Sequence, residues 1–318
     1  MTNRRQTLAG IAAACAAPAL LAQQGSAMRL IVGFAPGGSI DQTARQVAEQ
    51  FRAALGRAVV VENRAGAAGR LALEAVKAAR PDGDTLMLVP HGPMTLFPHI
   101  YRNLKYHPVR DFAPVGRVAT LDYALATGPQ TQAQSWAEFA RWAKEPANKP
   151  AFGSPGAGTV PHFIGTTVAQ RTGLPLAHVP YRGSALSAVD LMGGAIALTS
   201  SPLADVVEQH RAGKLRVLAT TGSERTAFLT GVPTLRELGI DFTLDGWYGI
   251  YAPAATPPER VQALTAALKA GASALREPLA KIGLREAVSD GSALAQVQKA
   301  ELAFWEPLVK ASGFTPED

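Results

Sequence analysis

Short apolar runs alternate along the chain with segments in which apolar residues recur every three or four positions. The runs are too short for helices and end at glycine, proline or asparagine, which is typical of buried strands. Ile40, Ala44, Val47, Ala48 and Phe51 share one face of a helix. The first third therefore predicts strands at 29–34, 58–62 and 85–89 and helices at 40–55 and 71–79.

The same alternation continues further along the chain. It predicts helices at 136–143, 161–171, 185–192 and 204–211 and strands at 151–152, 177–179 and 196–199. Long extended stretches at 112–125 and 215–221 flank this region, and a strand near 246–251 and helices from 258 follow it. Such alternation indicates an α/β fold with mainly parallel strands. We expect two domains, with 121–221 inserted into a first domain made of 28–120 and 222–318, and a hinge between them.

Residues 1–27 have the pattern of an export signal. Arg4 and Arg5 precede an apolar run from Leu8 to Ala22, and small residues allow cleavage after Ala22 or Ala27. The run is shorter than the roughly 20 residues of a membrane span. The arginine pair leaves both the general secretory and the twin-arginine route open. We expect the mature protein in the bacterial periplasm. The single cysteine lies in the signal, so the mature chain has no cysteine, which suits that oxidising compartment.

Composition excludes several classes of protein. With 47% hydrophobic and 18% charged residues the chain is globular. Removing the two signal arginines lowers the formal charge from +6 to +4, and no basic run contains interleaved aromatics, so we expect no nucleic-acid partner. The six histidines lack metal-ligand spacing. No Gly-x-Ser-x-Gly, Ser-x-x-Lys or His-Glu-x-x-His motif occurs. We expect no cofactor, no metal and no enzymatic activity.

Two glycine-rich loops each lead from a strand into a helix. In 34–41, two glycines precede Ser39, a candidate N-cap with Gln42 three residues later. In 153–162, three glycines precede Thr159, a second candidate N-cap, and Pro161 suits the first helical turn. Either loop is compatible with a plain capped turn. Both also present backbone N–H groups to an anion at a helix N-terminus. Together they predict a carboxylate held between two domains.

Other loops follow strands that end at the same predicted edge. The glycine-rich segment 63–69 and the pair His91-Gly92 come after the second and third strands. α/β folds bind ligands at the carboxyl ends of strands, so we expect both segments to face the cleft.

Motifs spread over almost the whole mature chain resemble the Bug family of periplasmic solute-binding proteins, which are receptors associated with tripartite tricarboxylate transporters. The matching stretches are 34–38 with Asp41, 61–64 with Gly66 and Gly69, 81–83 with Thr85, 111–114, 156–162, 178–183, 190–194, 213–216 and 232–234. The resemblance implies a two-domain fold of the type 2 periplasmic-binding-protein class and a small carboxylate ligand in the inter-domain cleft.

The resemblance and the loops together nominate ligand-binding residues. Backbone amides of the two loops form the anion clamp, Phe34 and Ala67 line the pocket, and His162 and Tyr181 stand near its wall. The full set is Phe34, Gly37, Gly38, Ser39, Ala67, His91, Ser154, Gly156, Ala157, Gly158, Thr159, His162, Tyr181 and Ser201.

Two departures from the family pattern concern the ligand. Ala197 and Ser201 occupy positions where the family often has acidic residues that balance a ligand's ammonium group. Their absence favours a ligand without positive charge, such as a mono- or dicarboxylic acid. Arg70 occupies a position that is often smaller or uncharged, and it can pair with a distal carboxylate; a solvated arginine at a helix start is the alternative.

The sequence therefore predicts a monomeric receptor that passes a small carboxylate to a membrane component of a tripartite tricarboxylate transporter or to a sensor protein. Two alternatives remain open. One is a hydrolase-like enzyme on the same fold, and the other is a partner-interaction protein with a vestigial pocket.

Overall fold

The computed structural model describes residues 27–311, and the structural statements below refer to this range. The predicted export segment falls outside it, apart from Ala27, and so stays a prediction. Among the described residues, no helix combines the length and the hydropathy that a membrane span requires.

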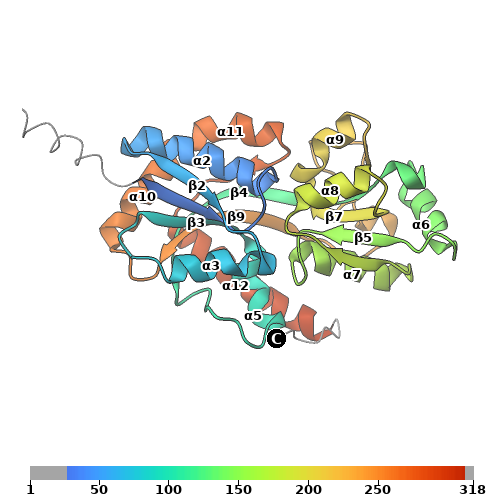
Figure 1. Ribbon diagram of the computed structural model, residues 1–318, viewed down its shortest axis with the longest axis horizontal. Coiled ribbons are helices and arrows are strands. Elements are labelled where there is room, and N and C mark those ends of the chain that lie inside the picture. Colours follow the sequence, from blue (N-terminus) through green and yellow to red (C-terminus); the bar gives the residue numbers. More distant parts are fainter. Residues whose placement is uncertain (1–26, 312–318) are drawn as a thin grey trace, which may run out of the picture.

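The described chain forms two α/β lobes that share one continuous sheet (Figure 1). Its strands lie in the order β2-β1-β3-β9-β4-β7-β5-β6, and β8 and β10 both pair with β4. The strands are β1 Met28–Val32, β2 Val59–Asn63, β3 Thr85–Pro90, β4 Phe112–Thr127, β5 Ala151–Ser154, β6 Ala177–Pro180, β7 Leu198–Pro202, β8 Arg216–Thr220, β9 Asp245–Pro253 and β10 Arg285–Glu286.

The long strand β4 passes from the first lobe into the second. As far as Asp122 it pairs antiparallel with β9, and its last residues pair antiparallel with β7 and β8. Parallel pairing holds for β1 with β2 and β3, and for β5 with β6 and β7. The prediction of mainly parallel strands is therefore wrong at the centre of the molecule. There the chain leaves along one strand and returns along its neighbour, which makes the pair antiparallel.

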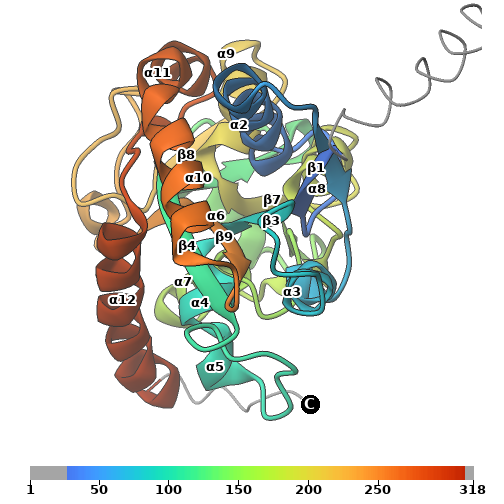
Figure 2. The same cartoon turned by 90° about the vertical axis from the view of Figure 1, so that its left-hand side faces the viewer.

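Helices cover both faces of the sheet, which explains the uninterrupted apolar runs of the strands. In the first lobe, Leu30 of β1 packs in one core with Phe51 of α2, whereas its neighbour Ile31 packs in another with Leu73 of α3. Figure 2 shows α10, α11 and α12 on the left of this lobe. The helices are α2 Ser39–Leu55, α3 Arg70–Lys77, α4 His91–Thr95, α5 Phe97–Ile100, α6 Trp136–Lys144, α7 Val160–Thr172, α8 Ser184–Met192, α9 Val207–Arg211, α10 Pro258–Ala270, α11 Ala272–Lys281 and α12 Gly291–Ala311.

The stretch that follows β8 keeps contacts with the second lobe. After β8, Thr234 forms a bridge with Thr220, and Val232 belongs to the same core as Leu203 and Leu215 of the second lobe. Pairing with the first lobe resumes at β9. We therefore propose that the second lobe extends to about residue 244 rather than 221. The short strand β10 has no counterpart among the predictions, since two residues carry no periodicity.

Candidate ligand-binding site

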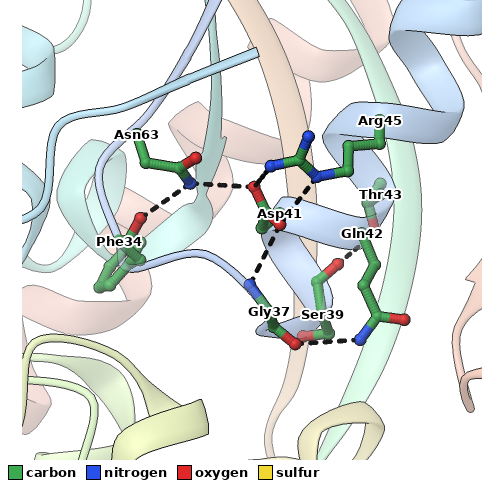
Figure 3. Close-up of polar contacts among 8 residues, drawn as sticks. All are labelled: Phe34, Gly37, Ser39, Asp41, Gln42, Thr43, Arg45 and Asn63. Carbon is green, nitrogen blue, oxygen red and sulfur yellow. Dashed lines mark hydrogen bonds and ion pairs between the residues drawn. The ribbon is translucent and has the colours of Figure 1, made fainter.

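The first glycine-rich loop runs from the carboxyl end of β1 into α2 and is held by Asp41 (Figure 3). The Asp41 carboxylate accepts hydrogen bonds from the Gly37 N–H (3.1 Å), Asn63 Nδ2 (2.9 Å) and two nitrogens of Arg45 (3.0 and 3.1 Å). Burial raises the pKa of Asp41, but the hydrogen bonds and the Arg45 charge outweigh it and hold that pKa below its usual value. Asp41 therefore supports the loop and the first turn of the helix.

Ser39 does not cap α2, contrary to the prediction. The N-cap is Gly38, and Ser39 lies one position further into the helix. Its hydroxyl is engaged with the Tyr248 hydroxyl (2.8 Å), so it is not the acceptor for a first-turn N–H. The predicted partner Gln42 instead donates through Nε2 to the Gly37 carbonyl (3.1 Å). No side chain in the first turn of α2 therefore accepts a hydrogen bond from the Ser39 N–H, which donates instead to a residue of the second lobe.

The second glycine-rich loop leads into α7, and Thr159 caps that helix as predicted by accepting from the His162 N–H (3.4 Å). Most of its other amides are used within the loop. This loop has four of the predicted clamp amides, those of residues 156–159. The Gly156 N–H donates to Ser154 Oγ (3.4 Å), the Gly158 N–H to His162 Nδ1 (3.0 Å) and the Thr159 N–H to the Gly156 carbonyl (3.3 Å). Of these four, only the Ala157 N–H has no hydrogen bond among residues 27–311. This loop is a weaker anion clamp than the sequence indicated.

Two histidines stack behind this loop. The rings of His162 and His178 lie 3.7 Å apart between centroids, and His178 Nε2 is 2.8 Å from Ser154 Oγ. Burial lowers the pKa of His162, and burial together with the neighbouring His162 lowers the pKa of His178 to about 3. At neutral pH both rings are uncharged, so neither supplies a positive charge to an anionic ligand.

The two lobes touch through direct hydrogen bonds. These run from the Ala35 N–H to the Arg182 carbonyl (3.1 Å), from the Tyr101 hydroxyl to the Ala157 carbonyl (3.1 Å), and from the Ser39 N–H to Asp205 Oδ1 (2.5 Å). Gly158 allows the second of these contacts. Its backbone has φ +72°, and a Cβ there would lie 2.2 Å from the Tyr101 hydroxyl oxygen.

A cavity of about 50 Å³ lies between the start of α2 and the second lobe, and we call it the inner cavity. This is room for a few water molecules. Its polar side chains include the hydroxyls of Tyr123, Tyr248 and Ser184 and the carboxylate of Asp205, and no Lys, Arg or His lines it. It is lined by Phe34, Ala35, Gly38, Ser39, Ile40, Pro90, Gly92, Pro93, Tyr123, Pro155, Thr159, Val160, Pro161, Gly183, Ser184, Pro202, Asp205 and Tyr248.

A larger cavity of about 440 Å³, the outer cavity, shares Phe34 and Pro155 with the inner one. Arg70 belongs to it: its guanidinium carbon lies 3.8 Å from the centroid of the Tyr101 ring, and its Nε donates to the Ala67 carbonyl (3.1 Å). The lining residues are Gly33, Phe34, Ala65, Gly66, Ala67, Ala68, Gly69, Arg70, Leu71, Tyr101, Pro155, Gly156, Ala157, Pro180, Tyr181 and Arg182. The outer cavity is therefore lined by the arginines Arg70 and Arg182, whereas the inner one is lined by the acid Asp205.

The structure divides the predicted site residues into three groups. Those lining the inner cavity are Phe34, Gly38, Ser39 and Thr159. Those lining the outer cavity are Phe34, Ala67, Gly156, Ala157 and Tyr181. Those lining neither are Gly37, His91, Ser154, Gly158, His162 and Ser201. Members of the last group hold the loops or the core; Ser201, for example, is fully buried in β7.

His91 is fully buried behind the inner cavity. Its Nδ1 lies 2.7 Å from Glu301 Oε2 and its Nε2 lies 2.7 Å from the Tyr123 hydroxyl, while Trp247 Nε1 donates to Glu301 Oε1 (2.6 Å). His91 itself does not line the cavity and contacts it through Tyr123. His91 orients Tyr123, whose side chain does line the cavity.

Sequence reasoning missed Ser184 and Asp205. Ser184 begins α8, and Asp205 ends a short 3-10 turn, Leu203–Asp205, directly after β7. A polar residue just beyond a strand's carboxyl end is a usable signal. This signal was overlooked for Asp205 because the sequence predicted a helix over 204–211, which placed Asp205 within that helix rather than in a loop after the strand. Among the described residues, no group of three or more His, Cys, Asp or Glu side chains is arranged to hold a metal ion.

Comparison with known proteins identifies close relatives. Residues 43–314 match the model of the family described as "Tripartite tricarboxylate transporter family receptor". A protein encoded in the gbd 5' region of Cupriavidus necator is 34% identical over 91% of this chain and 90% of its own length. The protein BugT of Bordetella pertussis is 34% identical over 79% of this chain and 77% of its own length.

Several solved structures have a fold similar to that of this chain over most of its length. The periplasmic binding protein BugD has a TM-score of 0.87 at 30% identity, covering 91% of this chain and 98% of its own. MatC from Rhodopseudomonas palustris, with bound malate, has a TM-score of 0.83 at 28% identity, covering 89% and 98%. R. palustris Rpa4515, with adipate, has a TM-score of 0.86 at 28% identity, covering 92% and 98%. The predicted two-domain, periplasmic-binding-protein-like fold is confirmed.

Proposed function

The chain belongs to the tripartite tricarboxylate transporter receptor family, and on this premise we propose that it binds a small mono- or dicarboxylic acid between its two lobes. The observation that carries the proposal is the pair of adjoining cavities at the lobe interface. Relatives of the same fold hold malate and adipate, which are small carboxylic acids.

The outer cavity supplies the groups that a carboxylate needs. Arg70 and Arg182 line it, and the Ala157 N–H has no hydrogen-bond partner among the described residues. Arg70 lies against the face of Tyr101, which limits its freedom and so reduces the entropy lost on binding. The ligand carboxylate is therefore held here, rather than at the start of α2, whose Ser39 N–H already binds Asp205.

The protein acts in the periplasm as a monomer. It delivers its ligand to the membrane component of a tripartite tricarboxylate transporter or to a sensor protein. Family membership and the predicted export segment support this part of the proposal.

An enzyme on the same fold has one observation in its favour, the hydrogen bond between Ser154 and His178. Two others oppose it. Ser154 lines neither cavity, and the low pKa of His178 makes that ring a poor general base. Binding without chemistry fits the arrangement better.

The test is thermal unfolding of the purified protein, stripped of ligand by unfolding and refolding, against mono-, di- and tricarboxylates, aromatic acids and amino acids. Ligand at about 100 times its dissociation constant stabilises by about 2.7 kcal/mol. A rise in melting temperature with a few related acids, each recovered unchanged by mass spectrometry, supports the receptor. Chemical conversion of an acid favours the enzyme. Absence of any shift favours the partner-interaction protein.

A further inference from the structure

A carboxylate of the protein itself already occupies the N-terminus of α2. Asp205 reaches across from the second lobe, and its Oδ1 accepts the Ser39 N–H at 2.5 Å. The hydroxyls of Ser39 and of Ser184, the first residue of α8, lie close enough to this carboxyl to lower its pKa. The first residues of α2 and α8, one helix from each lobe, therefore line the same cavity as this half-buried acid. A carboxylate supplied by a ligand would seek the same position.

Within residues 27–311, no cationic side chain is in contact with this acid. The inner cavity that Asp205 lines contains no Lys, Arg or His, and the contacts of its carboxylate are neutral N–H and O–H groups. The titratable side chains facing it from β4 and β9 are Tyr123 and Tyr248, and burial raises the pKa of both. Both tyrosines therefore stay neutral, and the Asp205 carboxyl is the acidic group at the inner end of the cleft. A second carboxylate placed there meets like-charge repulsion in a poorly solvated site.

Building on the proposed function, we propose that Asp205 determines ligand specificity by binding a cationic group, so that the ligand carries a protonated amine at one end and its carboxylate at the other. The amine lies in the inner cavity next to Asp205. The carboxylate lies in the outer cavity, where Arg70 and Arg182 supply positive charge. Phe34 and Pro155, which line both cavities, flank the hydrocarbon between the two ends.

This inference replaces one expectation from the sequence. Ala197 and Ser201 are indeed not acidic, which favoured a ligand without positive charge. The acid comes instead from Asp205, four residues beyond Ser201, because the turn after β7 brings it back to the start of α2.

The experiment compares probes that differ mainly in one end group. Caproate, adipate, ε-aminocaproate and hexylamine share a six-carbon chain, and malate and aspartate form a shorter pair. Each is titrated calorimetrically into the wild-type protein, into Asp205→Asn and into Glu208→Gln. Glu208→Gln is the matched control because it removes an acid three residues away, on the exposed surface of α9, where Glu208 pairs with Arg211.

In the wild type, ε-aminocaproate binds about tenfold or more tightly than adipate, or aspartate binds about tenfold or more tightly than malate. Asp205→Asn removes or reverses this preference, and Glu208→Gln leaves it intact. Tighter binding of adipate and malate to the wild type, or an amine preference that survives Asp205→Asn, overturns the inference.

The probes also separate this inference from the proposed function. Acids that bind equally well to the wild type and to Asp205→Asn support a carboxylate receptor and refute the role of Asp205. If hexylamine binds through Asp205 while caproate and adipate do not bind, the role of Asp205 stands and carboxylate recognition fails. If no probe binds, both proposals fail for these chain lengths.

A measurement on the unaltered protein covers the case in which Asp205→Asn does not fold. Lowering the pH from about 8 to about 5 leaves an alkyl amine protonated. Because burial raises the pKa of Asp205, this carboxyl gains its proton at a higher pH than an exposed aspartate does. The affinity for ε-aminocaproate should fall over this range by a larger factor than that for caproate. Equal dependence of both affinities on pH contradicts the inference.

Discussion

Replacement of Gly158 by alanine should weaken ligand binding far more than it weakens the fold. Gly158 has φ +72°, and a Cβ there would lie 2.2 Å from the Tyr101 hydroxyl oxygen, which belongs to the other lobe. Gly173, at the opposite end of α7, has φ +66° and no atom within 4 Å of the corresponding position. Gly173→Ala is therefore a matched control that has the same backbone strain without the clash.

The magnitudes follow from these two environments. The left-handed conformation costs an alanine about 1–2 kcal/mol, which lowers the stability of both variants similarly. Only in Gly158→Ala must the lobes separate. This gives up the hydrogen bond from Tyr101 to the Ala157 carbonyl, worth about 0.5–1.5 kcal/mol, and relieves an overpacking of about 1–3 kcal/mol. The form in which the lobes touch thus loses about 1.5–4.5 kcal/mol relative to a form in which they are apart, which is roughly a tenfold to two-thousandfold loss of affinity.

The assay pairs denaturant unfolding with calorimetric titration of the acid that most stabilises the wild type. Small-angle scattering of the ligand-free variants reports directly on lobe separation. Similar unfolding free energies and a large difference in affinity between Gly158→Ala and Gly173→Ala are expected. Equal affinities of the two variants would refute the reasoning, because they would show that binding does not bring Tyr101 against Gly158.

Three further predictions concern groups that hold the site in place. Asp41→Asn should lower the unfolding free energy at neutral pH by about 1.5–3 kcal/mol, through lost charge-assisted hydrogen bonds. The pKa of Asp41 is lower in the folded protein than in the unfolded chain. Asp41 therefore stabilises the fold above the pKa of the unfolded chain, and this stabilisation is lost as the pH falls through the pKa of the folded protein. The unfolding free energy of the variant should thus depend less on acidic pH than that of the wild type. The His178 ring should stay neutral down to about pH 3, and nuclear magnetic resonance should show no titration between pH 5 and 8; a midpoint near the usual 6.5 would contradict the burial. Glu301→Gln should destabilise by about 1–3 kcal/mol and alter tryptophan fluorescence, since Glu301 accepts from Trp247 Nε1; unchanged stability and emission would show that this network contributes little.

Local pattern was enough to place most elements of the fold. The apolar stripe from Ile40 to Phe51 predicted α2 to within one residue at its start, because amphipathic periodicity reports which face a helix buries. Thr159 was correctly identified as a cap, since capping depends on residues within one turn. Ser39 fits the same sequence pattern for an N-cap, but it does not cap α2. The Tyr248 hydroxyl, 209 residues away in the sequence, takes its side chain.

The sequence predicted most of the loops that line the two cavities but not that Asp205 lines one of them. Residues such as Phe34, Gly38 and Ala67 line cavities because they follow strands that end at the lobe interface. His91 also follows such a strand, but its ring points into the core toward Glu301. Position along the chain predicts which loop reaches a cleft, whereas side-chain direction depends on neighbours that are distant in sequence.

The sequence by itself determined the α/β alternation, the two glycine-rich helix starts and the family resemblance, because each rests on residues close together or on motifs in a set order. Only the tertiary structure decided what those helix starts bind. Ser39 and Asp205 are 166 positions apart, and a hydrogen bond between them exists only where two lobes bring a helix N-terminus and a carboxylate together. A favourable charge pairing acts through space, so the electrostatics of the cleft follow from the fold rather than from any local pattern.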